Sequence, residues 1–255
     1  MTPDELDRAL RQLRLGGMAE VLTVRAQQAR AETLGPLDFL GLLVHDELQR
    51  RRDRLVDRRV KHAMFRDSKT LDTFNWNFNP IDRALIFELA TGRFIEQHDD
   101  VLILGNAGVG KSHIAQGIAM AAIHAGFRVL YREAHTLFEE LVLAGATGER
   151  STVIAAFVEI PLLVLDDLGM RRLPTSAAED LLEIIMRRYE RTSTIITSNR
   201  PLDDWPKMFG DTPAVAAFLD RLMHHAHLIE IRGKSYRLHE SGLTARQRKA
   251  KPPTP

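Results

Sequence analysis

The spacing of apolar residues divides the chain into a helical first part and a second part in which strands and helices alternate. Over residues 1–70, leucine, methionine and valine recur three or four positions apart, which is typical of amphipathic helices. A Gly-Gly pair at 16–17 predicts a break after the first helix. A Leu-Gly-Pro triplet at 34–36 predicts a turn before a long helix over about residues 37–65. We therefore expect residues 1–70 to form a small, all-helical N-terminal domain.

From about residue 83 the pattern changes to short apolar runs that alternate with helical stretches. Such alternation is typical of a parallel sheet with helices on both faces, so we expect an α/β domain over residues 83–243. The aromatic segment 71–82 is predicted to be an extended linker packed on that domain, and the basic, proline-rich residues 244–255 a disordered tail. The predicted strands are 100–104, 128–131, 162–165, 193–197 and 227–231, and the predicted helices are 112–125, 134–144, 176–189 and 214–224.

The amino-acid composition excludes several classes of site and location but does not change the predicted fold. The 255 residues carry 35 Lys+Arg and 34 Asp+Glu, so the formal net charge of +1 does not indicate a nucleic-acid partner. Cysteine is absent, which excludes disulfides, thiolate metal sites and cysteine nucleophiles and agrees with a reducing compartment. The start of the chain lacks the layout of a signal peptide, and no apolar run approaches the ~20 residues of a membrane-spanning helix. We therefore expect a cytoplasmic protein with no membrane partner.

The most specific motif is Gly105-Asn106-Ala107-Gly108-Val109-Gly110-Lys111-Ser112, which matches G-x-x-x-x-G-K-[ST]. It follows an apolar strand and opens the helix that continues with His113. The glycines would allow backbone N–H groups to converge on phosphate oxygens, and the helix N-terminus adds a favourable dipole. Lys111 could then reach the β- and γ-phosphates, and the Ser112 hydroxyl could ligate Mg²⁺. The motif predicts a site for ATP and Mg²⁺ at residues 105–113.

Two further strands end in polar side chains that could lie beside this loop. The strand over 162–165 is followed by Asp166 and Asp167. Asp166 would serve Mg²⁺ through Ser112 and water, and Asp167 would polarise the attacking water as a general base. An aspartate in such a place could also cap a helix. Asn199 follows the next strand and could orient the attacking water or bind the γ-phosphate, unless it only closes an Asx-turn.

The sequence also separates the classes of phosphate-loop protein. It contains neither the N-K-x-D motif with which GTPases read guanine nor the L-S-G-G-Q-type signature of transporter ATPases. Nothing identifies the lid and substrate pocket of a small-molecule kinase. In an oligomeric ATPase, a neighbouring subunit could supply an arginine to the phosphates. Arg221, between the fourth and fifth predicted strands, is the candidate.

The order of GNAGVGKS, LLVLDDLG, STIITSNRP, FLDRL and GKSYR along the chain resembles the AAA+ ATPases of the DnaA/DnaC/IstB group. It is most similar to the IstB-type insertion-sequence ATP-binding proteins, and the likeness covers most of residues 1–240. The resemblance implies a P-loop AAA+ ATPase domain and ATP-dependent assembly on duplex DNA. It also implies a homo-oligomer with ATP at its subunit interfaces and assistance to a cognate transposase.

The same resemblance gives roles to single residues. Arg237, in the segment Lys234-Ser235-Tyr236-Arg237, resembles a second sensor arginine. Only a short stretch follows that segment, so the helical lid of a full AAA+ protein is expected to be missing or vestigial. The other implied roles are Walker A for Lys111 and Ser112, Walker B for Asp166 and Asp167, sensor 1 for Asn199, and an arginine finger acting in trans for Arg221.

Positive charge is concentrated in residues 50–69, where nine Lys and Arg stand against three Asp. A cationic strip along a helix there would bind DNA phosphates strongly, with little sequence preference and with a dependence on salt. The alternative is a solvated helix face or ion pairing with Asp53 and Asp57. The predicted DNA-binding residues are Arg50, Arg51, Arg54, Arg58 and Lys61, with Arg171 and Arg172 in the loop after Asp167 as further candidates.

Two other functions stay open at this point. A replicative helicase loader of the DnaC type would share the ATPase core but use its N-terminal segment to grip a helicase, for which a more apolar surface is expected. A monomeric phosphotransferase would show turnover that does not rise with protein concentration. His224, His225 and His227 lie at a helix-to-strand junction, and their spacing does not predict convergence on one metal ion.

Overall fold

The computed structural model describes residues 1–169, 175–209, 213–240 and 242. It divides into two compact units, Met1–Arg59 and Val60–Pro255. The division falls earlier in the chain than residue 70, because residues 60–82 pack within the second unit. The proposed tail and the two candidates Arg171 and Arg172 lie outside the described residues. Among the described residues, no helix is both long enough and apolar enough to cross a membrane.

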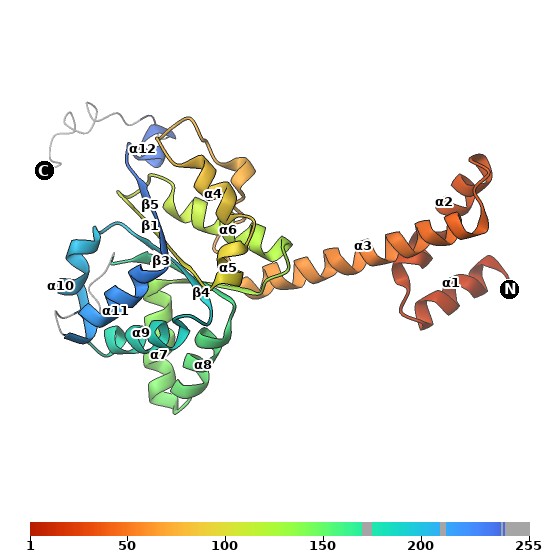
Figure 1. Ribbon diagram of the computed structural model, residues 1–255. Coiled ribbons are helices and arrows are strands. Elements are labelled where there is room, and N and C mark those ends of the chain that lie inside the picture. The colour runs from red at the N-terminus through yellow and green to blue at the C-terminus, as the bar shows by residue number, and fades with distance from the viewer. Residues whose placement is uncertain (170–174, 210–212, 241, 243–255) are drawn as a thin grey trace, which may run out of the picture. The chain divides into compact units, whose positions relative to one another are not determined.

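The first unit consists of the helices α1 (Pro3–Gln12), α2 (Gly16–Ala31) and most of α3 (Pro36–Ala63) (Figure 1). A capping box starts α1, because the side chains of Thr2 and Glu5 each accept from the backbone N–H of the other. The glycine pair and the proline lie at the starts of α2 and α3, so the predicted breaks are confirmed. Much of the apolar side of α3 is exposed, including Leu40, Val44, Leu48 and Leu55.

The second unit contains a five-stranded parallel sheet with the strand order β2-β3-β4-β1-β5. In the register of the sheet, Val101 of β1 lies between Ile195 of β4 and His227 of β5. The central strands β1, β3 and β4 are almost wholly buried, which explains their continuous apolar runs. The strands are β1 (Asp100–Gly105), β2 (Val129–Glu133), β3 (Leu162–Leu168), β4 (Ser193–Ser198) and β5 (Ala226–Ile231). The α/β fold class predicted from the sequence is confirmed.

Helices cover both faces of this sheet (Figure 1). On one face lie α4 (Arg83–Leu89), α5 (Arg93–Gln97) and α6 (Lys111–His124). On the other face, β1, β3 and β4 share a core with α7 (Ala134–Thr147), α8 (Arg150–Glu159), α9 (Thr175–Arg188), α10 (Trp205–Phe209) and α11 (Pro213–His224). The remaining elements are α12 (Tyr236–Glu240) and the short 3₁₀ turns η1 (Leu71–Thr73) and η2 (Leu202–Asp204). The sequence pattern missed α4, α5, α8, α10 and α12.

A buried arginine joins several elements on the face of the sheet that α7 to α11 cover. Arg188, at the end of α9, is 1% exposed. Its guanidinium donates to the carbonyl oxygens of Phe157, Ile160 and Ser193 and, at 3.0 Å, to the hydroxyl of Thr194. Burial lowers the pKa of Arg188 to about 10, which leaves it charged at neutral pH. Its contacts fasten the end of α8 and the start of β4 to α9.

Candidate nucleotide site

The loop between β1 and α6 is shaped by glycines that no other residue could replace without strain. Gly108 and Gly110 have φ angles of 81° and 112°, in the left-handed region that favours glycine. A Cβ atom at Gly108 would lie 2.2 Å from the Ser235 hydroxyl, and one at Gly110 would lie 2.7 Å from the ring of Phe74. The loop is therefore enclosed by two segments that are distant in the sequence.

Lys111 is the first residue of α6 and its side chain is held inside the loop. The residue is 4% exposed, and Nζ donates to the carbonyl oxygen of Asn106 at 3.0 Å. Burial lowers the pKa of Lys111, and the negative charges of Asp167 and Asp166 oppose that shift. The ammonium group is thus poised beside two carboxylates at the carboxyl end of β3.

Asp166 is fixed by hydroxyl groups from the two strands that flank β3. Tyr131 of β2 donates its phenolic proton to Oδ2 of Asp166 at 2.5 Å, and Thr197 of β4 donates to Oδ1. Asp166 is 1% exposed. Burial raises the pKa of Tyr131, and the neighbouring charge of Asp166 raises it further. Each carboxylate oxygen therefore already has a protein donor.

Asp167 has a backbone conformation unusual for a residue with a side chain. Its φ angle is 58°, and its N–H donates to the Thr197 hydroxyl at 2.9 Å. The pairing of β3 with β4 shifts register between Leu165 and Leu168, around this residue. Burial raises the pKa of Asp167, the charge of Asp166 adds to the increase, and Lys111 opposes it. The strained turn directs this carboxyl group toward the cavity, where strain often marks a functional residue.

A cavity of about 360 Å³ lies over this loop and brings together most of the predicted site. Gly105, Asn106, Asp166 and Arg221 are not among its lining residues. Asn199, exposed just after β4, is one of them. The predicted residues that line the cavity are Ala107, Gly108, Val109, Gly110, Lys111, Ser112, His113, Asp167, Asn199 and Arg237.

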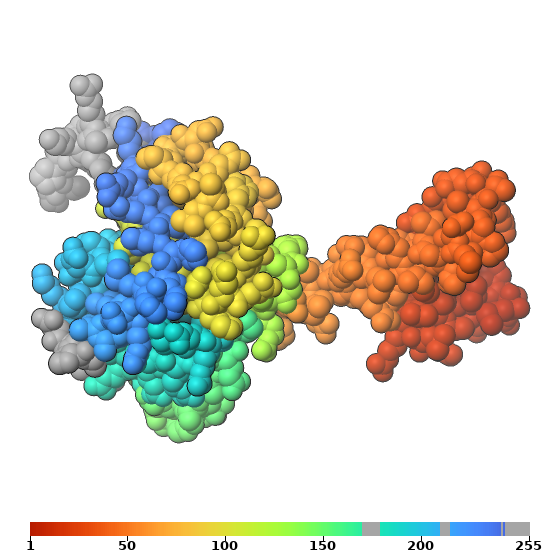
Figure 2. Space-filling view, in the orientation of Figure 1, coloured from red at the N-terminus to blue at the C-terminus, as the bar shows by residue number. Residues whose placement is uncertain are grey.

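The segment before α4 forms a wall that the motifs did not reveal. The side chain of Asn79 donates to the carbonyl oxygens of Val109 at 3.3 Å and Lys234 at 3.0 Å, and it accepts from the N–H of Lys234. In Figure 2, the gold segment that follows α3 and the blue segment after β5 lie side by side. The aromatic run over residues 74–78 was the sequence feature from which this wall could have been predicted. The additional lining residues are Lys69, Thr73, Phe74, Asn75, Phe78, Asn79, Tyr236 and Glu240.

His113 lines the cavity, but its ring is held by the same wall. Nε2 of His113 lies 2.9 Å from the carbonyl oxygen of Thr70 and 3.1 Å from the Thr73 hydroxyl. Burial lowers the pKa of His113. These contacts join α6 to η1.

Helix α12 contacts the loop through its backbone. The N–H of Tyr236 donates to the carbonyl oxygen of Gly108 at 2.8 Å. This contact places Arg237 at the cavity wall, where its charge affects the pKa values of both Lys111 and Asp167. The arginine is exposed.

Arg221 lies elsewhere, exposed on α11. Its guanidinium lies 5.9 Å from the ring centre of Tyr189, and Nη1 lies 3.1 Å from the sulfur of Met186. It does not line the cavity of its own chain.

The basic residues of α3 fall into two groups. Arg50 pairs with Glu20 of α2, and Arg51 pairs with Glu47 at 2.6 Å and donates to the carbonyl oxygen of Arg14. These two side chains hold helices together. In contrast, Arg54 and Arg58 are exposed and have no ion pair among the described residues, and Lys61, in the second unit, is also exposed. The sequence therefore predicted one DNA-binding strip, although Arg50 and Arg51 hold helices together and differ in this from the exposed cations.

Comparisons with known proteins agree with this geometry. The sequence profile of the family described as IstB-like ATP binding protein matches residues 8–244. An ATP-binding protein of insertion sequence IS5376 from Geobacillus stearothermophilus is 34% identical over 238 residues, which cover 93% of this chain and 95% of the relative. One of insertion sequence IS21 from Pseudomonas aeruginosa is 34% identical over 92% of this chain and 89% of its own. The crystal structure of the DnaC helicase loader superposes with a TM-score of 0.53 and 25% identity, covering 64% of this chain and 96% of that one.

Proposed function

The chain belongs to the family of IstB-like ATP binding proteins, and from this premise we propose that it is a cytoplasmic AAA+ ATPase that assembles on duplex DNA and assists a cognate transposase. The observation that carries the proposal is the cavity in which the phosphate loop, Asp167 and Asn199 meet. A buried lysine of the phosphate loop beside strand-end carboxylates is the arrangement that P-loop NTPases use for phosphoryl transfer. ATP is the substrate, since the sequence lacks the guanine-reading motif.

We infer that the loop holds the phosphates of ATP through its backbone N–H groups, Lys111 and Ser112. The residues present fit Mg²⁺, because Ser112 and Asp167 line the same cavity and hydroxyl and carboxylate oxygens are ligands that Mg²⁺ accepts. Asp166 is 1% exposed and does not line the cavity, so it fits a role through Ser112 and water. When bound, Mg²⁺ supplies positive charge that neutralises the phosphate oxygens.

In this proposal Asp167 takes a proton from the attacking water as general base. The raised pKa of Asp167 brings the carboxylate closer to neutral pH, where a base accepts a proton more readily. Asn199, with an amide at the cavity wall, orients that water or contacts the γ-phosphate. Arg237 adds a second cation at the same wall.

The position of Arg221 supports an oligomer. Its side chain is exposed and away from the cavity of its own chain, so it serves the phosphates only when a neighbouring copy presents it. ATP then lies at the interface between subunits, and ATP binding favours assembly. Free cations at Arg54 and Arg58 give the first unit its contacts with DNA phosphates.

One observation favours a second function, that of a helicase loader. Leu40, Val44 and Leu48 of α3 are exposed, and such an apolar face suits a protein partner better than DNA. The solved DnaC helicase loader is 25% identical and is covered over 96% of its chain. In this alternative the second unit, Val60–Pro255, which we call the ATPase unit, acts in the same way, and the first unit, Met1–Arg59, which we call the helical unit, binds a helicase.

The test is sedimentation of the purified chain with random duplex DNA, with a non-hydrolysable ATP analogue, with ADP and without nucleotide, at salt of about 0.05 M and about 0.2 M. We expect a large complex that requires the ATP analogue and weakens with salt. Absence of duplex binding in every nucleotide state would refute the transposition role and direct the next pull-down to a replicative helicase.

Two variants test the chemistry in the same assay. Asp167→Asn should retain assembly with ATP but lose turnover by about 100-fold or more, as expected for loss of a general base. Arg221→Ala should be inactive alone. Mixed with Lys111→Ala, it should recover turnover, because each variant supplies what the other lacks. An inactive mixture that nevertheless co-assembles would remove Arg221 from the mechanism.

A further inference from the structure

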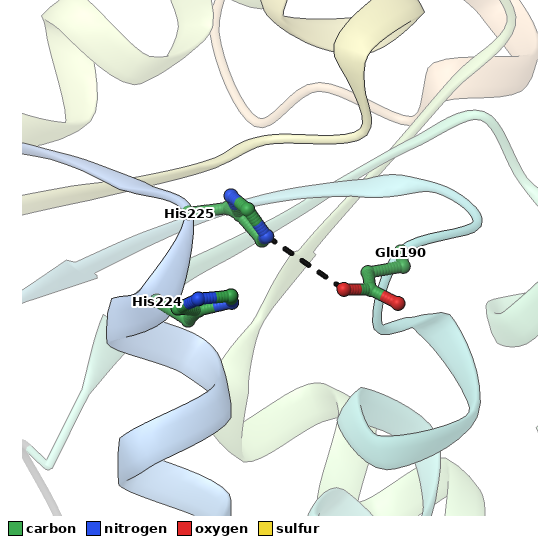
Figure 3. A group of neighbouring side chains, drawn as sticks. All are labelled: Glu190, His224 and His225. Carbon is green, nitrogen blue, oxygen red and sulfur yellow. Dashed lines mark ion pairs between the residues drawn. The ribbon is translucent and has the colours of Figure 1, made fainter.

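A cluster of potential metal ligands lies where α11 ends and β5 begins (Figure 3). Glu190 comes from the turn after α9, and His224 and His225 come from the junction itself. One ligand atom from each of these side chains lies within 4.8 Å of the other two, and all three residues are exposed. The N–H of Asp100 donates to the carbonyl oxygen of His225 at 3.0 Å, which ties the junction to the start of β1.

This cluster is separate from the nucleotide site. Strands β1 and β5 are parallel, and Asp100 pairs with Ala226 at their starts. The phosphate loop follows the opposite end of β1. A metal ion at the cluster would therefore be distinct from the Mg²⁺ that accompanies ATP.

We propose that Glu190, His224 and His225 bind a divalent transition-metal ion of the Zn²⁺ type. Two imidazoles and one carboxylate form a ligand set that binds Zn²⁺ and leaves a fourth position open. Nε2 of His225 already lies 3.7 Å from Oε1 of Glu190, and in Figure 3 the two side chains point toward one another. Small side-chain rotations bring these donors onto one ion.

A neighbouring tyrosine can orient one of the ligands. The hydroxyl oxygen of Tyr189 lies 3.0 Å from Nδ1 of His224. A proton on Nδ1 that is donated to this oxygen leaves Nε2 with the lone pair that a metal requires, as is common for metal-binding histidines. His227 stands apart, because its Nε2 pairs with Asp99 at 3.3 Å. The spacing of the three histidines did not predict this cluster, since its acidic member comes from another turn.

Tyr189, which neighbours the cluster, also contacts the arginine that the proposed function assigns to a neighbouring subunit. Arg221 lies one helical turn before His224, and its guanidinium faces the ring of Tyr189. A metal ion that fixes Tyr189 and the end of α11 restricts the reach of Arg221. We therefore expect Zn²⁺ to slow ATP turnover. This consequence rests on the proposed function, whereas metal binding does not.

The first experiment is calorimetric titration of the untagged, EDTA-washed full chain with zinc chloride, without nucleotide. We expect one Zn²⁺ per chain and an affinity that falls by about tenfold or more in Glu190→Gln and in His225→Asn. His227→Asn is the matched control and should bind like the wild type. Thermal melting without zinc shows whether each variant is folded. A wild-type chain that binds no Zn²⁺, or variants that bind it equally well, would overturn the proposal.

The second experiment measures ATP turnover with and without zinc chloride in the wild type and in His225→Asn. Inhibition of the wild type alone would support the link from the cluster to Arg221. Equal inhibition of both chains would overturn that link, because zinc would then act at the nucleotide site. A chain that binds Zn²⁺ but has no ATP turnover would contradict the proposed function and leave the metal site standing.

Discussion

The unit Val60–Pro255 buries the strands of its sheet between two layers of helices, whereas the unit Met1–Arg59 has almost no apolar interior. Ala19 and Leu43 are the buried apolar side chains of that first unit, all of whose residues are described. Its helices are joined instead by charged groups, among them Arg25, which pairs with Asp46 through two hydrogen bonds of 2.7 and 2.8 Å. Burial of apolar side chains stabilises a fold more than surface ion pairs do. The second unit therefore has the larger source of folding stability.

The two units also differ in how their functional side chains are held. The second unit fixes its site residues without a ligand, whereas the first presents exposed side chains that suit a partner. In the second unit, the side chain of Asp166 is fixed by buried hydroxyl groups before any substrate arrives. In the first, free cations such as Arg58 and exposed apolar residues such as Leu48 lie along one helix without contacts that satisfy them. We infer that the ATPase unit is organised before it binds a ligand, and that the helical unit presents a surface that suits a partner.

The largest expected effect comes from removing the buried cation of the phosphate loop. Lys111→Ala should lower ATP turnover by about 100-fold or more and abolish binding of a fluorescent ATP analogue, because it removes the ammonium group that the loop holds at the carbonyl oxygen of Asn106. Lys207→Ala, on the exposed surface of α10, is the control and should retain both. Lys111→Ala should also fail to form the complex on duplex DNA that the ATP analogue induces in the wild type. A complex of wild-type size formed by Lys111→Ala with the analogue would contradict the role of Lys111.

A second large effect should appear in stability and be confined to the ATPase unit. Arg188→Met keeps most of the side-chain volume but leaves the carbonyl oxygens of Phe157, Ile160 and Ser193 buried without a donor. We expect the free energy of unfolding in urea to fall by about 3–5 kcal/mol, because each buried acceptor that loses its donor costs about 1–3 kcal/mol. Arg187→Met, which removes an exposed pair with Glu183, should leave the urea midpoint almost unchanged. Equal midpoints for the two variants would contradict the structural role of Arg188.

The sequence predicted local features of the ATPase unit well, for physical reasons. Buried parallel strands must be apolar along their length, so β1, β3 and β4 are visible as continuous runs. The phosphate loop is equally local, since its function depends on neighbouring residues within one turn. The short helix α8 was missed because its pattern resembles that of a buried segment of any kind.

Features that depend on distant partners were not predictable in this way. Asn79 lines the cavity because it bonds to Lys234, 155 positions later in the chain. Spacing along α3 gave Arg50 and Arg58 equal standing, but only Arg50 meets a carboxylate, on another helix. Helical periodicity shows which residues share a face and does not show what that face contacts.

The third prediction tests the surface role of the helical unit. In Arg54→Gln/Arg58→Gln, affinity for random duplex DNA should fall by about tenfold, and the slope of log K against log salt should become less steep by about 2. Arg11→Gln, which removes a cation paired with Asp7 at 2.8 Å, is the control and should change neither. ATP turnover without DNA should be equal in all three chains. An unchanged salt slope in the double variant would remove these two cations from the DNA contact.

The smallest effect should come from the polar interior of the helical unit, where Glu47 accepts from the N–H groups of Gly17 and Met18 at 2.6 and 3.3 Å. Burial opposes ionisation of Glu47, but these bonds and the one from Arg51 outweigh it and lower its pKa. Glu47→Gln should therefore raise hydrogen exchange at the start of α2 about fivefold at neutral pH, the equivalent of about 1 kcal/mol.

A lowered pKa stabilises the fold fully above the ordinary pKa of 4.5, and this stabilisation is lost as the pH falls through the lowered pKa of the folded protein. The ratio of exchange rates between variant and wild type should therefore approach unity once the pH is below that lowered pKa. Glu20→Gln, which loses only the half-exposed partner of Arg50, should leave exchange at the start of α2 unchanged both at neutral pH and below the lowered pKa of Glu47. Exchange that is the same in Glu47→Gln and the wild type at neutral pH would mean that the helical unit does not depend on its buried charge. The contrast between a helical unit held together by charged groups and an ATPase unit held together by apolar burial would then not hold at Glu47.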